Sequence, residues 1–136
     1  MNNFLKKVIA QSPDDLHIIS AICADSKVKI SDIKYLPSTK IFLLSVLRED
    51  KETDSSKPIN SIIKFEFIQS SKSKNINQSN ADLTLELFAI DIFKKKENFE
   101  KVLLFSKNGI ITLSTEVIDV TSVSYTHLTL PTILRV

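Results

Sequence analysis

Residues that commonly carry catalytic or metal-binding chemistry are rare in this sequence. His17 stands close to Asp14 and Asp15 in a segment that predicts a helix, so its imidazole could act as a general base beside an acid. A histidine on the solvent side of the helix, loosely paired with an acid, explains the same residues. Cys23 lies six positions further along, too far round a helix for the two side chains to bind one metal ion. Its place among apolar residues favours a buried thiol over a reactive one.

A charged cluster follows the most apolar predicted strand. Arg48, Glu49 and Asp50 come directly after residues 41–47, so a buried strand would carry them to the edge of the sheet. A guanidinium forms paired hydrogen bonds with carboxylates and phosphates. These three residues are therefore the candidate ligand-binding site, for a small molecule or an anion. A solvated strand end explains the cluster without any ligand.

The motifs of several enzyme classes are missing from the sequence. Gly109 is the single glycine, so a glycine-rich phosphate loop is excluded. No serine has the surroundings of a nucleophile elbow. Zinc binding by one cysteine and one histidine outside the C-terminal tail would need added carboxylates. We predict no catalytic residues, no metal and no cofactor, and an enzyme that uses His17 is the least favoured hypothesis.

Composition narrows the class of protein further. The chain has 136 residues, which favours one domain, and 18 basic against 16 acidic residues leave a charge of only +2. Because the lysines are scattered, we expect no nucleic-acid partner. A single cysteine excludes an internal disulfide and suits a reducing cytoplasm. No apolar run approaches the ~20 residues of a membrane span, so we expect a cytoplasmic protein with no membrane partner.

One amphipathic helix, over residues 12–25, organises the predicted fold. Ser12 is a good N-cap, Pro13 suits the first helical position, and two aspartates then place negative charge at the positive end of the helix dipole. An apolar face at helical spacing follows. Its members are Leu16, Ile19, Ile22 and Cys23, with Ile18 beside them. Such a helix needs a partner surface, which the strands must supply.

The remainder of the chain predicts strands and turns. Apolar patterns predict strands over residues 4–10, 28–34, 41–47, 62–68, 83–92, 102–105 and 110–120. A change of phase near Ser31-Asp32 indicates a bulge or bend. Asn108-Gly109 predicts a hairpin turn because both residues tolerate positive φ, whereas the low hydrophobicity of residues 70–80 predicts a mobile loop. The fold class is therefore α+β, a curled antiparallel sheet or meander of about seven strands around one N-terminal helix.

Residues 122–136 are predicted to differ in origin from the domain. Residues 123–132 match the translation of a transposase-type sequencing adapter, and Val136 stands where that adapter would encode a valine before a stop codon. We predict a single domain over residues 1–121, whose native C-terminus is missing, and an artefactual tail over residues 122–136. His127, Tyr125 and Arg135 are therefore excluded as functional residues.

Several short motifs follow one another along residues 4–121. They are Leu5-Lys6 to Ile9-Ala10, Asp14-Asp15-Leu16, Ile18 to Ala21 with Asp25, Asp32, Leu36-Pro37, Phe42, Phe65 with Ile68, Leu85 to Ile90, and Gly109 to Leu113 with Glu116, Ile118 and Asp119. In order and spacing they resemble the bacterial family known as domain of unknown function 2948. The family's usual Asn-Arg-aromatic-Trp-Glu stretch appears only as Leu47-Arg48-Glu49-Asp50. The resemblance implies a small cytoplasmic bacterial protein and gives no activity.

These observations favour a non-enzymatic binding or protein-interaction module. A strand-rich domain offers sheet edges that can pair with a partner strand, so we expect a protein partner or a second copy of the chain. The alternative is a domain that binds a small molecule or an anion through Arg48 and the loop that follows it.

Overall fold

The computed structural model describes residues 4–49 and 58–125. This part of the chain holds one α-helix, α1 (Pro13–Cys23), one 3-10 turn, η1 (Ile30–Asp32), and ten strands. The strands are β1 (Phe4–Ala10), β2 (Ser26–Lys29), β3 (Ile33–Leu36), β4 (Ile41–Glu49), β5 (Pro58–Phe65), β6 (Ile68–Lys74), β7 (Thr84–Lys94), β8 (Phe99–Phe105), β9 (Ile110–Thr115) and β10 (Val120–Tyr125).

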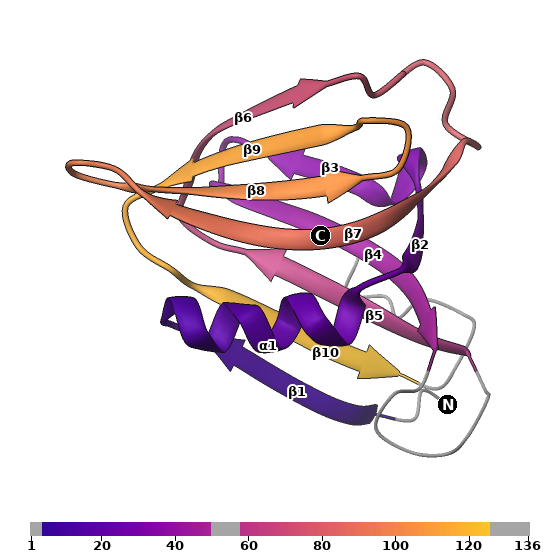
Figure 1. Cartoon of the computed structure of the whole chain (residues 1–136), viewed down its shortest axis with the longest axis horizontal. Coiled ribbons are helices and arrows are strands. Elements are labelled where there is room, and N and C mark those ends of the chain that lie inside the picture. Colours follow the sequence, from indigo (N-terminus) through magenta and orange to yellow (C-terminus); the bar gives the residue numbers. More distant parts are fainter. Residues whose placement is uncertain (1–3, 50–57, 126–136) are drawn as a thin grey trace.

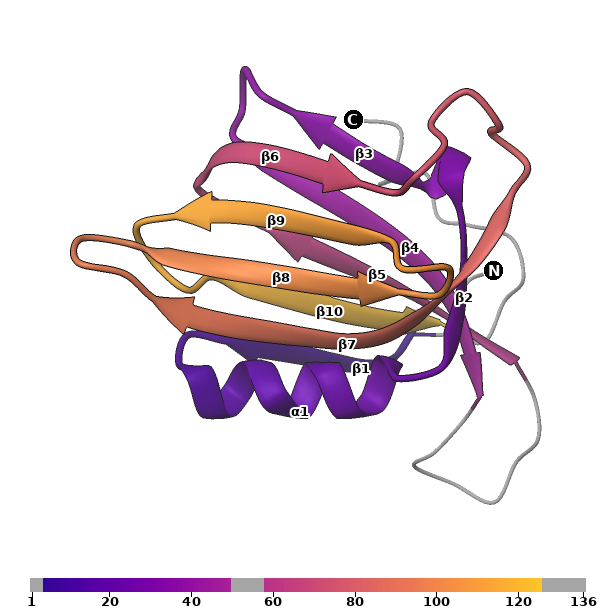
Figure 2. The same ribbon diagram turned by 45° about the horizontal axis from the view of Figure 1, so that its top comes forward.

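All ten strands belong to one antiparallel sheet that curls over on itself. Its order is β1-β10-β5-β4-β2-β7-β8-β9-β6, and β3 pairs with the side of β4. In Figures 1 and 2, β7, β8, β9 and β6 form one layer, while β1, β10, β5, β4 and β3 form the other. The core lies between the two layers. The predicted antiparallel α+β fold is confirmed, whereas the predicted number of about seven strands is wrong.

Three strands were not predicted because their local sequence does not mark them. The predicted strand over residues 28–34 is interrupted by η1, at the phase change near Ser31-Asp32, and so contributes to both β2 and β3. The predicted strand over residues 110–120 ends at Thr115 and restarts as β10. The predicted mobile loop over residues 70–80 begins with most of β6, a strand too polar to be recognised by its pattern.

The helix has the predicted start and the predicted buried face. The Ser12 side chain accepts a hydrogen bond from the Asp15 amide at 3.2 Å, with proline in the first turn. Leu16, Ile19 and Cys23 are fully buried. Figure 2 shows α1 lying across the opening between β1 and β7.

The helix also replaces a strand neighbour of β7. β2 pairs with only the first part of β7, residues 84–87, and the register of β7 on β8 shifts between Leu87 and Ala89. Beyond that irregularity, the Ile90 amide donates to the Ser20 hydroxyl of α1 at 2.9 Å. The helix thus supplies both an apolar face and a hydrogen-bond acceptor where the sheet opens.

The β8–β9 hairpin lies where it was predicted, but its glycine has a different role. Lys107 and Asn108 adopt positive φ (58° and 61°), and Gly109 does not. A Cβ atom on Gly109 would lie 3.2 Å from Cγ1 of Ile76 and 3.3 Å from Cβ of Phe105. The glycine leaves room for this close approach of the loop after β6, while Lys107 and Asn108 take the positive φ of the predicted turn.

The predicted domain boundary near Thr121 falls inside a strand. Ala10 is the register partner of Val120 and Val8 that of Ser122, while the other side of β10 pairs with β5. Residues 126–136 lie outside the described residues. The adapter origin of the tail stays a prediction.

Replacing Leu16 by alanine is expected to lower the free energy of unfolding by about 2–5 kcal/mol, because the change leaves a cavity in a fully buried position. Ile18→Ala is the matched control on the same helix. Since Ile18 is 51% exposed, its loss should change stability by no more than about 0.5 kcal/mol. Urea unfolding followed by circular dichroism measures both variants, and equal losses would contradict the burial of one helix face.

Candidate functional site

The predicted ligand residue Arg48 lies inside the sheet. Its side chain is 3% exposed. Nε donates to the Ser61 hydroxyl at 2.8 Å, Nη2 donates to the Ser124 hydroxyl at 3.1 Å, and Nη1 donates to the Glu49 carbonyl at 3.1 Å. The two hydroxyl oxygens are themselves 2.7 Å apart. The guanidinium is therefore engaged by groups of the protein itself.

Ser124 falls within the predicted tail, whereas Ser61 and Glu49 belong to the predicted domain. Glu49 is the exposed last residue of β4, and Asp50 lies outside the described residues. A ligand site built from Arg48, Glu49 and Asp50 stays a prediction.

The two residues weighed most closely for catalysis differ in exposure. His17 is exposed on α1, whereas the thiol of Cys23 is buried. Asp15 instead accepts a hydrogen bond from the Gln11 amide at 3.3 Å. Within residues 4–49 and 58–125, no three His, Cys, Asp or Glu side chains are placed to hold a metal ion. In the same residues no helix has the length and apolar character needed to cross a membrane.

A hollow of about 380 Å³ separates the edges of two strands that face each other. Among the described residues, β6 is paired with β9 alone and β3 with β4 alone. Ile33 and Tyr35 line the hollow from β3, and Ser71 and Ser73 line it from β6. Figure 2 shows these two strands at the side of the molecule away from α1. We call this hollow the β3–β6 slot.

The floor of the β3–β6 slot is apolar and its β6 wall is polar. Phe42, Ile111 and Ile30, all core residues with at most 7% exposure, form the floor. On the β6 side, Ser73 accepts a hydrogen bond from the Gln78 side-chain amide at 2.7 Å. The slot can therefore accept an apolar group in its depth and polar groups along one wall.

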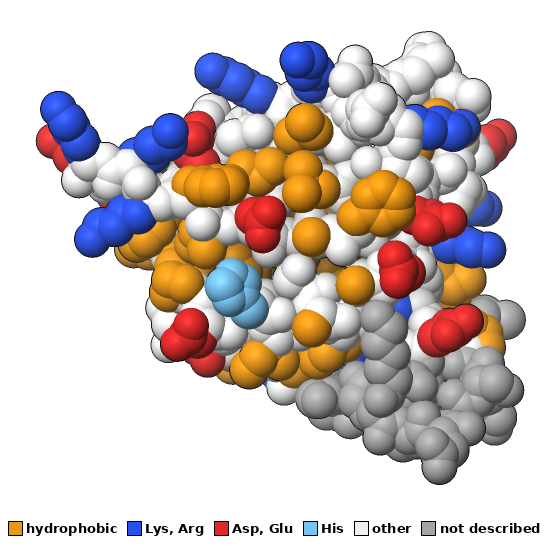
Figure 3. Space-filling view, in the orientation of Figure 1, with side chains coloured by type: hydrophobic (Ala, Val, Ile, Leu, Met, Phe, Trp, Pro, Cys, Tyr) orange, Lys and Arg blue, Asp and Glu red, His pale blue; other side chains and the backbone are white. Residues whose placement is uncertain are grey.

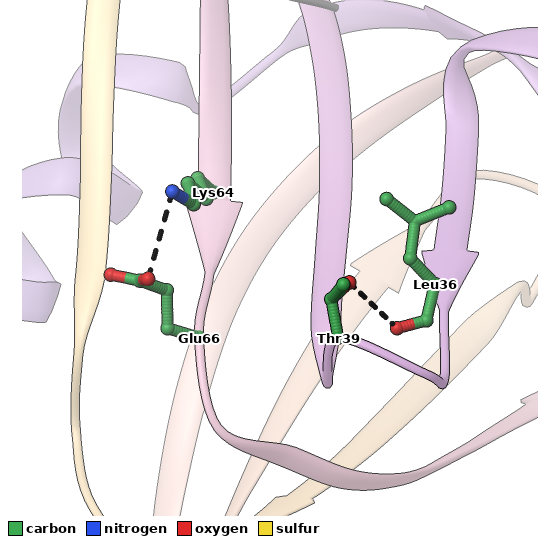
Figure 4. A network of polar contacts seen from close by, with 4 residues as sticks. All are labelled: Leu36, Thr39, Lys64 and Glu66. Carbon is green, nitrogen blue, oxygen red and sulfur yellow. Dashed lines mark hydrogen bonds and ion pairs between the residues drawn. The ribbon is translucent and has the colours of Figure 1, made fainter. Parts of the chain in front are cut away.

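Backbone hydrogen bonds close both ends of the slot. At one end the Ile68 amide donates to the Lys40 carbonyl at 2.8 Å, beside the turn in which the Thr39 hydroxyl donates to the Leu36 carbonyl at 3.3 Å (Figure 4). At the other end the amides of residues 30 and 31 donate to carbonyls of the loop after β6, each at 3.0 Å. The two edges are therefore held in fixed positions, with the slot between them.

Sequence reasoning missed this site because it assigned residues 70–80 to a loop. Ser71 and Ser73 alternate with lysines along β6, so both serines lie on the same face of the strand, toward the slot. Small polar residues on an inward face indicate that this face does not pack into the core. The pattern alone does not identify a site, because the slot exists only where β6 lies opposite β3 in the folded chain.

One family profile, described as protein of unknown function (DUF2948), matches residues 6–130. The chain belongs to this family. The resemblance inferred from the short motifs is thereby confirmed, while the bacterial source and the cytoplasmic location stay predictions. Comparisons with curated proteins and with solved structures give no match. The DUF2948 description carries no activity.

The core of this DUF2948 protein contains a lysine. Lys101 of β8 is fully buried, and its Nζ has no hydrogen-bond partner among the described residues. Nζ lies 5.8 Å from the centre of the Phe65 ring. Burial lowers the pKa of Lys101 to about 8, and the negative charge of Asp119 offsets part of that effect. The amine therefore loses its proton more readily than an exposed lysine does.

Replacing Lys101 by methionine is expected to stabilise the protein at pH 7 by about 1–3 kcal/mol. The pKa of Lys101 is 10.5 in the unfolded chain and about 8 in the folded one. Between these pH values the unfolded state binds more protons, so the free energy of unfolding of the natural chain should rise with pH. The variant should lose that rise.

Thermal unfolding at several pH values from 7 to 10.5 tests this expectation, with the exposed Lys96→Met as control. The control should keep the dependence of stability on pH. An unchanged dependence in Lys101→Met would mean that this lysine is not the group responsible.

Proposed function

We propose that this DUF2948 protein is a non-enzymatic binding module that holds an extended segment of a partner protein in the β3–β6 slot. The observation that carries the proposal is the pair of unpaired strand edges facing each other across a hollow with an apolar floor. A cytoplasmic location would suit such a module, since its one cysteine is a buried thiol.

The backbone of the slot favours a strand as ligand. An edge strand presents a row of amide and carbonyl groups that have no partner within the sheet. An added strand satisfies such groups through main-chain hydrogen bonds. β6 offers seven residues for this pairing and β3 offers four.

The side chains of the slot favour an apolar residue at alternate positions of that ligand. Successive side chains of a strand point to opposite faces, so every second side chain of a bound segment would enter the hollow. There it would meet Phe42 and Ile111 on the floor. The volume of about 380 Å³ is near the lower end of the ~300–1,000 Å³ range of small-molecule pockets, which suits one or two side chains.

Titration with the peptide acetyl-Ser-Thr-Ile-Thr-Ile-Thr-Ser-amide, followed by amide chemical shifts, tests the proposal. We expect the shifts to concentrate in residues 33–36 and 68–74. Ser71→Phe, which fills the slot from β6, should weaken binding by about tenfold. Ser70→Phe is the matched control, because Ser70 does not line the slot.

Three results would contradict the proposal. They are shifts confined to β1, which is another sheet edge, equal binding by the two phenylalanine variants, and no binding at all.

A further inference from the structure

We infer that the segment held in the β3–β6 slot is acidic, with aspartate or glutamate alternating with isoleucine, leucine or valine. This inference rests on the proposed function and specifies the chemistry of the partner. It is carried by the lysines that surround the slot on the outer faces of its two edge strands.

Three exposed lysines flank the slot. Lys34 lies on β3, one residue before Tyr35, and Lys72 and Lys74 alternate with the two slot-lining serines of β6. A fourth exposed lysine, Lys40, lies at the closed end. Figure 3 shows blue lysine and arginine side chains along the upper edge of one face, where Figure 1 places β6.

Little negative charge opposes these lysines. On β9, the register partners of Lys72 and Lys74 are the uncharged residues Thr112 and Ile110. Among the described residues, Lys34, Lys72 and Lys74 form no ion pair. At the far end of the slot, the half-buried Asp32 interacts electrostatically with Lys34. Because this one carboxylate faces three lysines, the charge around the slot remains positive.

The alternation of side chains along a strand predicts which positions of the bound segment would face these lysines. When one side chain of a bound segment enters the hollow, the next one points outward, beside the outward side chains of β3 and β6. Side chains directly opposite each other on paired strands have Cβ atoms about 4.5–5.5 Å apart, close enough for opposite charges to stabilise the pair. Carboxylates at the outward positions would therefore meet Lys34 and Lys72.

The experiment compares three peptides with the same isoleucines. Glutamate, threonine or lysine occupies the outward positions, as in acetyl-Ser-Glu-Ile-Glu-Ile-Glu-Ser-amide. We expect the glutamate peptide to bind about tenfold more tightly than the threonine peptide. The lysine peptide should bind more weakly than either. Raising the salt concentration from about 0.05 M to about 0.5 M should remove most of the advantage of glutamate, because exposed charges are screened.

Charge reversal in the protein supplies the second arm. Lys34→Glu combined with Lys72→Glu should reverse the order, so that the lysine peptide binds best. Lys96→Glu, on the exposed β7–β8 turn, is the control and should leave the order unchanged.

The failure of this inference differs from that of the proposed function. If the glutamate and threonine peptides bind equally well in the slot, the slot binds strands and the inference is wrong. The lysines would then serve only to discourage unwanted edge pairing. If no peptide shifts the amides of β3 and β6, the proposed function itself fails and the inference falls with it.

Discussion

A sheet that curls over on itself without closing leaves two openings between its layers, and the apolar face of α1 fills one of them. Leu16 and Ile19 enter the core there, and Ser20 accepts a hydrogen bond from the part of β7 that lies beyond its pairing with β2. The second opening, between β3 and β6, has no such helix among the described residues. The candidate site is therefore the opening of the curled sheet that α1 does not fill.

Local features made the helix, the central strand and the β8–β9 hairpin predictable. Ser12 and Pro13 mark a helix start whatever the rest of the chain does, and the apolar run from Ile41 specifies a strand buried on both faces. β6 and the slot depend instead on pairing between distant segments. β6, a strand rich in serine and lysine, is held in the sheet by its pairing with β9. The local sequence of β6 does not indicate that pairing.

Arg48 shows a second limit of local patterns. Its charge indicated an exposed strand end, but the alternation of β4 puts it on the same face as the buried Val46. There, serine hydroxyls from two neighbouring strands accept its hydrogen bonds. Because a guanidinium keeps its charge at any ordinary pH, burial requires such partners. Lys101 meets the same constraint differently, since an amine can release its proton when burial makes the charge costly.

The pairing of β1 with β10 also has a consequence for how the chain reaches this fold. The two strands come from opposite ends of the described chain, roughly a hundred residues apart, so they form contacts of very long range. Contacts of this kind slow folding, because a large loop must close before they contribute any stability. During synthesis, β1 would leave the ribosome with α1 while its strand partner is still untranslated. Until β10 appears, β1 would remain an open edge that other chains could occupy.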